Sequence, residues 1–164
     1  MDQALKKVDH STLRVNQGVI IVLLLLGFVL NAPVLTAVVA FFMLGGTAIG
    51  RPGFFFVYTL VLRPLGIARP DVLLDNPEPH RFAQGFGGVV TALSAISLFL
   101  GGAVPGWLLA WLVIILAALN LFAGFCVGCA VYYWLHRLQV PGFYRNPPAG
   151  VFPGMRPKAQ RDAA

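Results

Sequence analysis

The fold is decided by an apolar stretch near the N-terminus, VNQGVIIVLLLLGFVLNAPVLTAVVAFFMLGGTAIG at residues 15–50, which contains no charged side chain. A helix rises about 1.5 Å per residue, and a membrane span needs about 20 apolar residues. The stretch is therefore too long for one span, and Asn31-Ala32-Pro33 interrupts it near its middle. Proline removes a backbone donor and restricts the residue before it, so this point predicts a turn between two helices.

A second stretch without Asp, Glu, Lys or Arg covers residues 82–136, and GGAVPG at residues 101–106 interrupts it. The same reasoning predicts a second hairpin of helices. The expected spans lie near residues 17–30, 33–50, 82–101 and 107–134. The predicted fold is thus an all-α integral membrane domain over residues 1–139, with four transmembrane helices arranged as two hairpins.

Composition and charge support a membrane protein. Of the 164 residues, 58% are hydrophobic and only 11% are charged, whereas about 25% are charged in soluble domains. The net charge of +6 is better explained by the positive-inside rule than by a nucleic-acid partner, because both hairpin turns lack basic residues. All twelve basic residues fall on one predicted side: Lys6, Lys7, Arg14, Arg51, Arg63, Arg69, Arg81, Arg137, Arg145, Arg156, Lys158 and Arg161. Both termini and the central connection are therefore expected in the cytoplasm.

The segments outside the predicted spans also carry signals. FFFVYTLVL at residues 54–62 is apolar but too short to span, which favours an interfacial or re-entrant helix in the central cytoplasmic connection. Residues 69–79 are polar and proline-rich and are expected to form a loop. Residues 140–164 contain five prolines and are expected to form a cytoplasmic tail along the surface.

The chemistry-bearing motif is the CxxC pair in GFCVGCAVYYWLHRL at residues 124–138. Three interpretations remain open. Cys126 and Cys129 are a redox dithiol, since residues i and i+3 of a helix lie about 5 Å apart, within disulfide range. They are metal ligands together with His80 and His10. Or they are small packing residues in a helix seam beside two glycines.

The predicted position of the pair bears on its reactivity. If a single helix continues to residue 134, the cysteines lie towards its C-terminal end, where the helix dipole opposes a thiolate. A reactive pair would then need a nearby cation or a break at Gly124. The motif PHRF at residues 79–82 opens the preceding helix at the same membrane face, so His80 and Arg81 are expected beside Cys126. The candidate catalytic residues are Cys126, Cys129, His80 and Arg81.

A third polar patch, DHSTLRVNQ at residues 9–17, lies where the first helix enters the bilayer. Asn16 and Gln17 are costly in hydrocarbon unless they are paired across helices or held at the interface. Gln84 lies one turn into the third predicted span. The polar residues at these inner rims predict a shared cytoplasmic pocket lined by His10, Arg14, Asn16, Gln17 and Gln84.

Three motifs, VDHSTLRVNQ, PEPHRFAQGFGG and GFCVGCAVYY, resemble those of a bacterial membrane family catalogued as domain of unknown function 4395, over about residues 8–135. The resemblance implies the four-helix architecture and a bacterial cytoplasmic (inner) membrane location, but no established activity. Members of that family are often encoded beside thioredoxin-like or sulfurtransferase genes, which favours thiol or sulfur chemistry.

The leading hypothesis is a membrane thiol–disulfide component that exchanges electrons with a thioredoxin-like partner or a quinone. Because the sequence contains only two cysteines, a relay across the membrane would need a quinone, a homo-oligomer or a further protein. The alternative is a non-enzymatic assembly or sulfur-transport accessory subunit in which CVGC packs a helix seam. A sulfurtransferase is a further candidate partner. Whether the protein is an enzyme stays open, and no nucleic-acid-binding module is recognisable.

Overall fold

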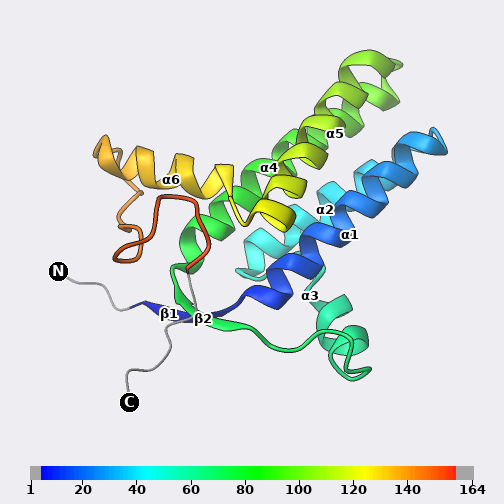
Figure 1. Ribbon diagram of the computed structural model, residues 1–164. Coiled ribbons are helices and arrows are strands. Elements are labelled where there is room, and N and C mark those ends of the chain that lie inside the picture. The colour runs from blue at the N-terminus through cyan, green and yellow to red at the C-terminus, as the bar shows by residue number, and fades with distance from the viewer. Residues whose placement is uncertain (1–4, 158–164) are drawn as a thin grey trace.

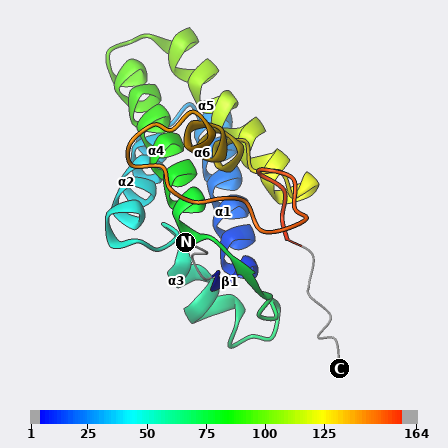
Figure 2. The same ribbon diagram turned by 90° about the vertical axis from the view of Figure 1, so that its left-hand side faces the viewer.

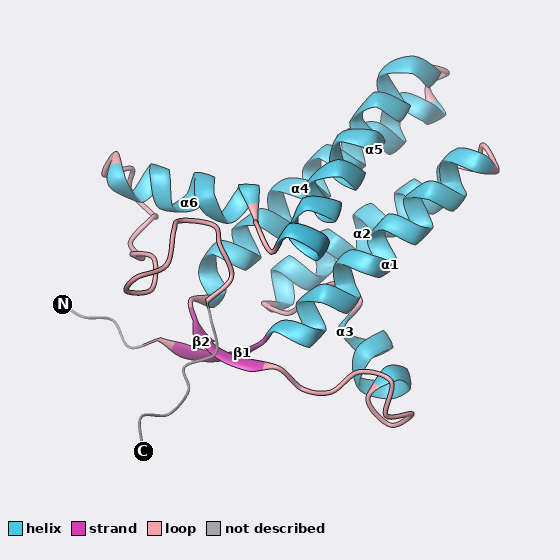
Figure 3. Ribbon diagram, in the orientation of Figure 1, coloured by secondary structure: helices cyan, strands magenta, loops and turns pink. Residues whose placement is uncertain are grey.

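A computed structural model describes residues 5–157, and the chain is mostly helical (Figures 1 and 3). The elements, in chain order, are β1 Lys6–Asp9, α1 His10–Val29, α2 Pro33–Ile49, α3 Phe55–Val57, the π-helix η1 Tyr58–Leu62, β2 Val72–Asp75, α4 Pro77–Phe99, α5 Ala103–Ala118, the π-helix η2 Leu119–Ala123 and α6 Val127–Arg137. The basic residues Lys158 and Arg161 of the expected tail lie outside the described residues.

Four long helices run alongside one another, and both expected turns are present (Figure 1). Asn31 adopts a positive φ of 47° between α1 and α2, and Gly101 a φ of 87° between α4 and α5. Three helical segments are long and apolar enough to cross a membrane, namely α1, α4 and the continuous segment of α5 and η2. Helix α2 is apolar but shorter, with 17 residues.

The core lies where α1, α2 and α5 meet, around Ile20, Leu24, Val39 and Val113. Many large apolar side chains instead point outward, including Leu100, which is 82% exposed. An apolar surface of this extent is unfavourable in water and suits a lipid environment. We call the end of the four helices where α1 and α4 begin the basic end, because the described lysines and arginines gather there.

The basic end is tied together by a two-stranded antiparallel sheet that hydropathy did not predict. β1 pairs with β2 so that Lys6 lies opposite Asp75 and Asp9 opposite Val72. The segment around β2 was expected to be a loop. The pairing brings the first residues of α1 and α4 together, because each strand leads almost directly into its helix.

The central connection is helical over α3 and η1, as the apolar segment at residues 54–62 predicted. Phe54 is buried against the core, with its backbone N–H bonded to Asn16 Oδ1 at 2.9 Å. The segment is thus fixed to α1 by a polar side chain.

The largest departure from expectation is a break in the segment expected to be one helix over residues 107–134. η2 ends at Ala123, the next residue Gly124 adopts a left-handed φ of 64°, and Cys126 is extended before α6 begins. α6 then runs across the other helices, so that Figure 1 shows it lengthwise and Figure 2 nearly end-on. A Cβ at Gly128 would lie 2.5 Å from that of Ala83, so this glycine permits close contact between α6 and α4. Gly124 and Gly128 therefore do not form a seam on one helix.

The described part of the tail folds back over this break. Cys126 N–H donates to Gly154 O at 2.7 Å, and Arg156 N–H donates to Gly124 O at 3.0 Å. The Arg156 side chain forms an ion pair with Asp71. The proline-rich segment is thus fixed along the surface beside the cysteines.

Candidate functional site

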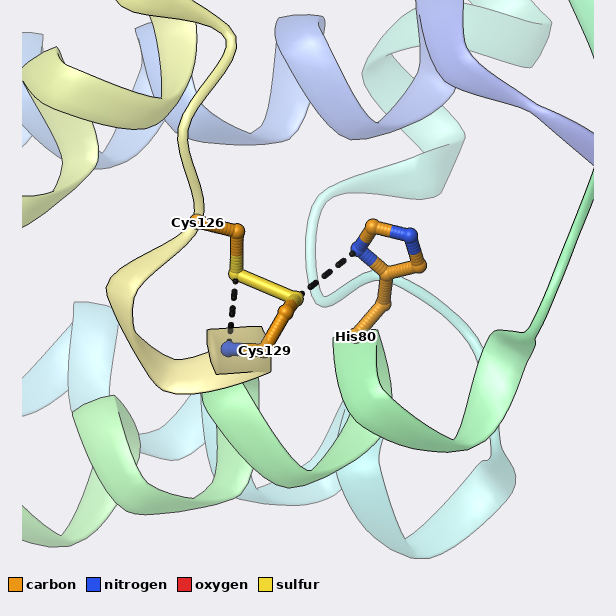
Figure 4. A group of neighbouring side chains, drawn as sticks. All are labelled: His80, Cys126 and Cys129. Atoms are coloured by element: carbon orange, nitrogen blue, oxygen red, sulfur yellow. Dashed lines mark hydrogen bonds between the residues drawn. A yellow bond between two sulfur atoms is a disulfide. The ribbon is translucent and has the colours of Figure 1, made fainter. Parts of the chain in front are cut away.

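The two cysteines lie at the N-terminus of α6 and are joined by a disulfide (Figure 4). Cys126 is the N-cap residue, and its Sγ accepts a hydrogen bond from Cys129 N–H at 3.2 Å. The two Cα atoms are 5.2 Å apart. Both residues are nearly covered, with exposed fractions of 6% for Cys126 and 2% for Cys129.

This position reverses the electrostatic expectation from the sequence. The prediction of a C-terminal location was wrong, because Gly124 ends one helix and Val127 begins another. A helix N-terminus carries unpaired N–H groups and a partial positive charge, which favour a thiolate. From the sequence, a reactive pair needed either a nearby cation or a helix break at Gly124, and the break is present.

A histidine–carboxylate chain leads away from the second cysteine. Cys129 Sγ lies 3.4 Å from His80 Nδ1 (Figure 4), and His80 Nε2 lies 2.9 Å from Asp75 Oδ2. His10 Nε2 approaches the same carboxylate oxygen at 3.1 Å, though without hydrogen-bond alignment. One buried carboxylate thus faces two imidazoles, and one of these imidazoles faces the disulfide.

The ionisation of Asp75 is fixed by these neighbours. Burial alone would raise the pKa of Asp75, but contacts with His10, His80 and the Asn76 N–H outweigh burial and lower this pKa well below its usual range. Asp75 therefore stays a carboxylate at neutral pH. A carboxylate only accepts hydrogen bonds, so it favours a proton on His80 Nε2. His80 Nδ1 is then free to accept a proton from the Cys129 thiol once the disulfide is reduced.

The local sequence explains how these groups meet. Asp75 is the last residue of β2, and Pro77 starts α4 at a position where its missing N–H costs nothing. His80 then lies in the first turn of α4. His10 follows β1 directly, so the antiparallel register sets it against the end of β2.

A polar cavity of about 310 Å³ opens beside the disulfide and is lined by both cysteines, His80, Asp75 and His10. Other lining residues are Arg14, Gln17, Asn120, Tyr133 and Arg156. Burial raises the pKa of Tyr133 to about 12, so this phenol remains protonated. Two arginines thus line the same cavity as the cysteines, the histidines and Asp75, and we call it the polar cavity.

The structure brings together most of the predicted site residues. Cys126, Cys129, His80, His10, Arg14 and Gln17 all line this cavity. Arg81 does not: its Nε donates to Thr47 O at 2.7 Å, at the C-terminal end of α2. The guanidinium therefore stabilises the last carbonyls of α2 and does not lie beside the thiols, contrary to expectation.

Asn16 and Gln84 are also near the site but act on the backbone. Gln84 Nε2 donates to Met43 O and Arg51 O, at 3.0 and 3.1 Å. Asn16 holds Phe54, as described above. Both amides thus connect the helices to the central connection. The pairing expected for Asn16 is present, whereas the described residues give the Gln17 side chain no hydrogen-bond partner.

Sequence reasoning missed Asp75, Asn120 and Tyr133. Asp75 looked like a solvated loop residue, and only the unpredicted strand pairing would have placed it. Asn120 had a usable signal, because it is a polar side chain in an otherwise apolar span. It also lies within the π-helix η2, an element that is frequent at functional sites.

Two triads of potential metal ligands are present among the described residues. One is His80, Cys126 and Cys129, and the other is His10, Asp75 and His80. His80 belongs to both, with a different ring nitrogen facing each. The expected four-ligand set of Cys126, Cys129, His80 and His10 is not assembled, because His10 Nε2 faces Asp75.

The fold and site together define a class: a helical membrane-type protein with a CxxC disulfide at a helix N-terminus, next to a buried His–Asp pair. The sequence model of a family described as "Domain of unknown function (DUF4395)" matches residues 8–137, and the chain belongs to this family. The family expected from the motifs is thereby confirmed. Neither a curated protein nor a solved structure matches the chain.

Proposed function

We propose that the protein is a membrane component for thiol–disulfide exchange, with Cys126 as the attacking sulfur and Cys129 as the resolving one. The observation that carries this proposal is the placement of the pair, with Cys126 capping α6 and Cys129 facing His80. The helix N-terminus and the Cys129 N–H stabilise a thiolate on Cys126. His80, oriented by Asp75, accepts the proton of Cys129.

The exchange proceeds in two balanced steps. The Cys126 thiolate attacks one sulfur of a partner disulfide, a mixed disulfide forms, and the other partner sulfur leaves as a thiolate. His80 Nδ1 then takes the Cys129 proton, and the Cys129 thiolate attacks Cys126 Sγ. The second partner sulfur leaves, and the Cys126–Cys129 disulfide remains. Two electrons pass to the partner, and the reverse sequence reduces the disulfide again.

The polar cavity supports a protein partner at the basic end. It lies beside both cysteines, and Arg14 and Arg156 line it, although Arg156 is also paired with Asp71. A thioredoxin-like protein, which carries its own reactive disulfide, has the required chemistry. This partner class agrees with the gene neighbours that the family resemblance implied.

A trapping experiment tests this function. In Cys129→Ser, the resolving thiol is absent, so Cys126 should hold a thioredoxin-like partner as a lasting mixed disulfide that dithiothreitol releases. Cys126→Ser should trap much less, because Cys129 is more deeply covered and lacks the capping position. If neither single variant traps a partner, and the double Ala variant is inserted and fully functional, the proposal is wrong.

The membrane arrangement belongs to the same proposal. We place four spans at α1, α2, α4 and α5–η2, with the basic end in the cytoplasm and α6 along the inner interface, where its face with Val131 and Trp134 is exposed. Single cysteines at Ala32 and Gly102, in a background without native cysteines, should react with an impermeant maleimide from outside intact cells. A cysteine at Ile67, an exposed residue of the central connection, should react only after lysis. Labelling of Ile67→Cys in intact cells would reject this topology.

A further inference from the structure

A second cavity adjoins the polar one and has a different character. It has a volume of about 150 Å³ and is lined mainly by apolar side chains of α1, α4, α5 and α6. Its lining includes Phe86 and Val131, which are exposed on the outer surface of the helices. We call it the lipid-side cavity, because in the proposed membrane arrangement these two side chains face lipid.

The two cavities share the reactive groups. Cys126, His80, Gln17 and Asn120 line both of them. The disulfide therefore lies between a polar chamber and an apolar one. A molecule in either chamber would lie beside Cys126.

The amides of Gln17 and Asn120 are the polar groups left for a ligand in the lipid-side cavity. Asn16 and Gln84 also line it, but their amides are bound to backbone groups. Within residues 5–157, the side chains of Gln17 and Asn120 make no hydrogen bond to the protein. An amide N–H₂ group is a donor that pairs with a carbonyl oxygen, and an unpaired amide is costly in hydrocarbon.

We propose that the lipid-side cavity binds the ring of a quinone, whose carbonyls accept hydrogen bonds from Gln17 and Asn120. This inference rests on the proposed function, since it names the electron acceptor of the reduced cysteine pair. A quinone ring is planar and apolar and carries two carbonyl oxygens. It also takes up two electrons and two protons, the same number that a dithiol releases when it forms a disulfide.

The reaction balances within the two chambers. The Cys126 thiolate adds to a ring carbon, and the ring gains an electron pair. His80 takes the Cys129 proton, and the Cys129 thiolate attacks Cys126 Sγ, which breaks the sulfur–ring bond and leaves both electrons on the ring. One ring oxygen receives the proton held by His80. The other receives a proton from water in the polar cavity, which replaces the proton that Cys126 released when it became a thiolate. A dithiol and a quinone thus become a disulfide and a quinol.

The test uses the full-length protein, reduced and placed in nanodiscs without oxygen. Decyl-ubiquinone is mixed in, and quinol absorbance and the remaining thiols are followed together. We expect one quinol per disulfide, formed faster than in the Cys126→Ser variant. Asn120→Leu and Gln17→Leu should each slow this reaction about ten-fold, the loss expected from one hydrogen bond to the reacting oxygen.

A steric variant separates the two cavities. Val131 lines the lipid-side cavity and not the polar cavity. Val131→Trp should therefore lower the rate of quinol formation about ten-fold relative to the rate of exchange with oxidised glutathione, which is expected to enter from the polar side. Leu138→Trp adds the same bulk to an exposed position that lines neither cavity and should change neither rate.

The outcomes distinguish the two proposals. If the reduced protein exchanges with oxidised glutathione but forms no quinol, or if Val131→Trp lowers both rates equally, the quinone inference is wrong and the proposed function stands. If the cysteines exchange with neither oxidant, the proposed function fails as well.

Discussion

The strongest test of the site is the substitution Asp75→Asn, because Asp75 sets the direction of proton transfer while touching neither cysteine. In the native site its carboxylate accepts from His80 Nε2 at 2.9 Å, which leaves Nδ1 as the acceptor for Cys129. An amide presents an N–H₂ group that prefers an acceptor, so it favours the other tautomer of His80. His80 Nδ1 then carries a proton and cannot accept another. The oxygen that binds the Asn76 N–H is retained.

The expected magnitude follows from the hydrogen bond that is lost. A hydrogen bond to a charged group contributes about 1.5–3 kcal/mol. When His80 takes the Cys129 proton it becomes an imidazolium, and in the native protein the Asp75 carboxylate stabilises it through such a bond. Asp75→Asn removes this stabilisation. Since about 1.4 kcal/mol corresponds to a factor of ten, the Cys129 thiolate should form about 10 to 150 times less readily at neutral pH.

The assay measures iodoacetamide alkylation of Cys129 in a Cys126→Ser background, over pH 5–9 in nanodiscs. Because the sequence has two cysteines, Cys129 is then the only thiol, and serine is itself a good N-cap, so α6 should begin as before. Glu78→Gln is the matched control. It removes one negative charge from the first turn of α4, which also carries His80, but Glu78 binds Arg145 and not His80. If Asp75→Asn alkylates within about two-fold of its parent, as the control should, Asp75 does not act through His80.

Three further predictions concern the fold around the site. Gly128→Ala should destabilise the protein by about 1–3 kcal/mol in thermal unfolding, since the added Cβ would meet Ala83. Gly45→Ala, at a position with open space, should have no such effect. Equal effects of the two variants would contradict the close contact between α6 and α4. Arg156→Gln removes the ion pair with Asp71 that holds the tail beside the cysteines. The disulfide should then be reduced faster by thioredoxin, and less so by dithiothreitol, because the tail obstructs a large reductant more than a small one. An unchanged ratio of the two rates would show that the tail does not restrict access. Because the pKa of Asp75 is lowered in the folded protein, its contribution to stability is complete above about pH 4 and should be lost as pH falls further. If the thermal midpoint of Asp75→Asn falls in acid as much as that of the native protein, Asp75 is not the source of the acid destabilisation.

Some features of the molecule were predictable because they depend on local chemistry. Proline at position 33 and the glycines at positions 101 and 102 mark chain reversals whatever surrounds them. The gathering of basic residues at one end follows from the same segmentation. The motifs around His10, His80 and Cys126 identified the family, and the three groups do meet in one site.

The position of Cys126 could not be predicted in the same way, because hydropathy continues unchanged through Gly124. Apolar residues lie on both sides of the break, so a helix through residue 134 was the simpler interpretation of the sequence. What ends η2 is a left-handed glycine together with the tail, whose Gly154 O accepts the Cys126 N–H. That contact joins residues far apart in sequence, and no local pattern predicts it.

The burial of Asp75 could not be predicted from the sequence either, for a different reason. Three apolar residues, Val72, Leu73 and Leu74, precede it, but this run is too short to show that the carboxylate after it is buried. It is buried because β1 pairs with β2, and these two strands are separated in sequence by α1, α2, α3 and η1. A carboxylate placed there without partners would be strongly unfavourable, and the two histidines that stabilise it come from the starts of two further elements.

The cysteine count and the two cavities together limit how electrons can move. A chain with a single CxxC pair can accept two electrons and must release them before it reacts again. If both exchanges occurred in the polar cavity, the incoming and outgoing partners would compete for one opening, and the apolar cavity beside Cys126 would have no role. If one exchange occurs on each side, Cys126 meets a protein disulfide or dithiol through the polar cavity and a lipid-soluble acceptor through the apolar one. His80 lines both cavities, so the same imidazole is placed to move the Cys129 proton in either exchange. Under the quinone proposal, one chain is then sufficient for the complete cycle, and a second cysteine pair or a homo-oligomer is not required.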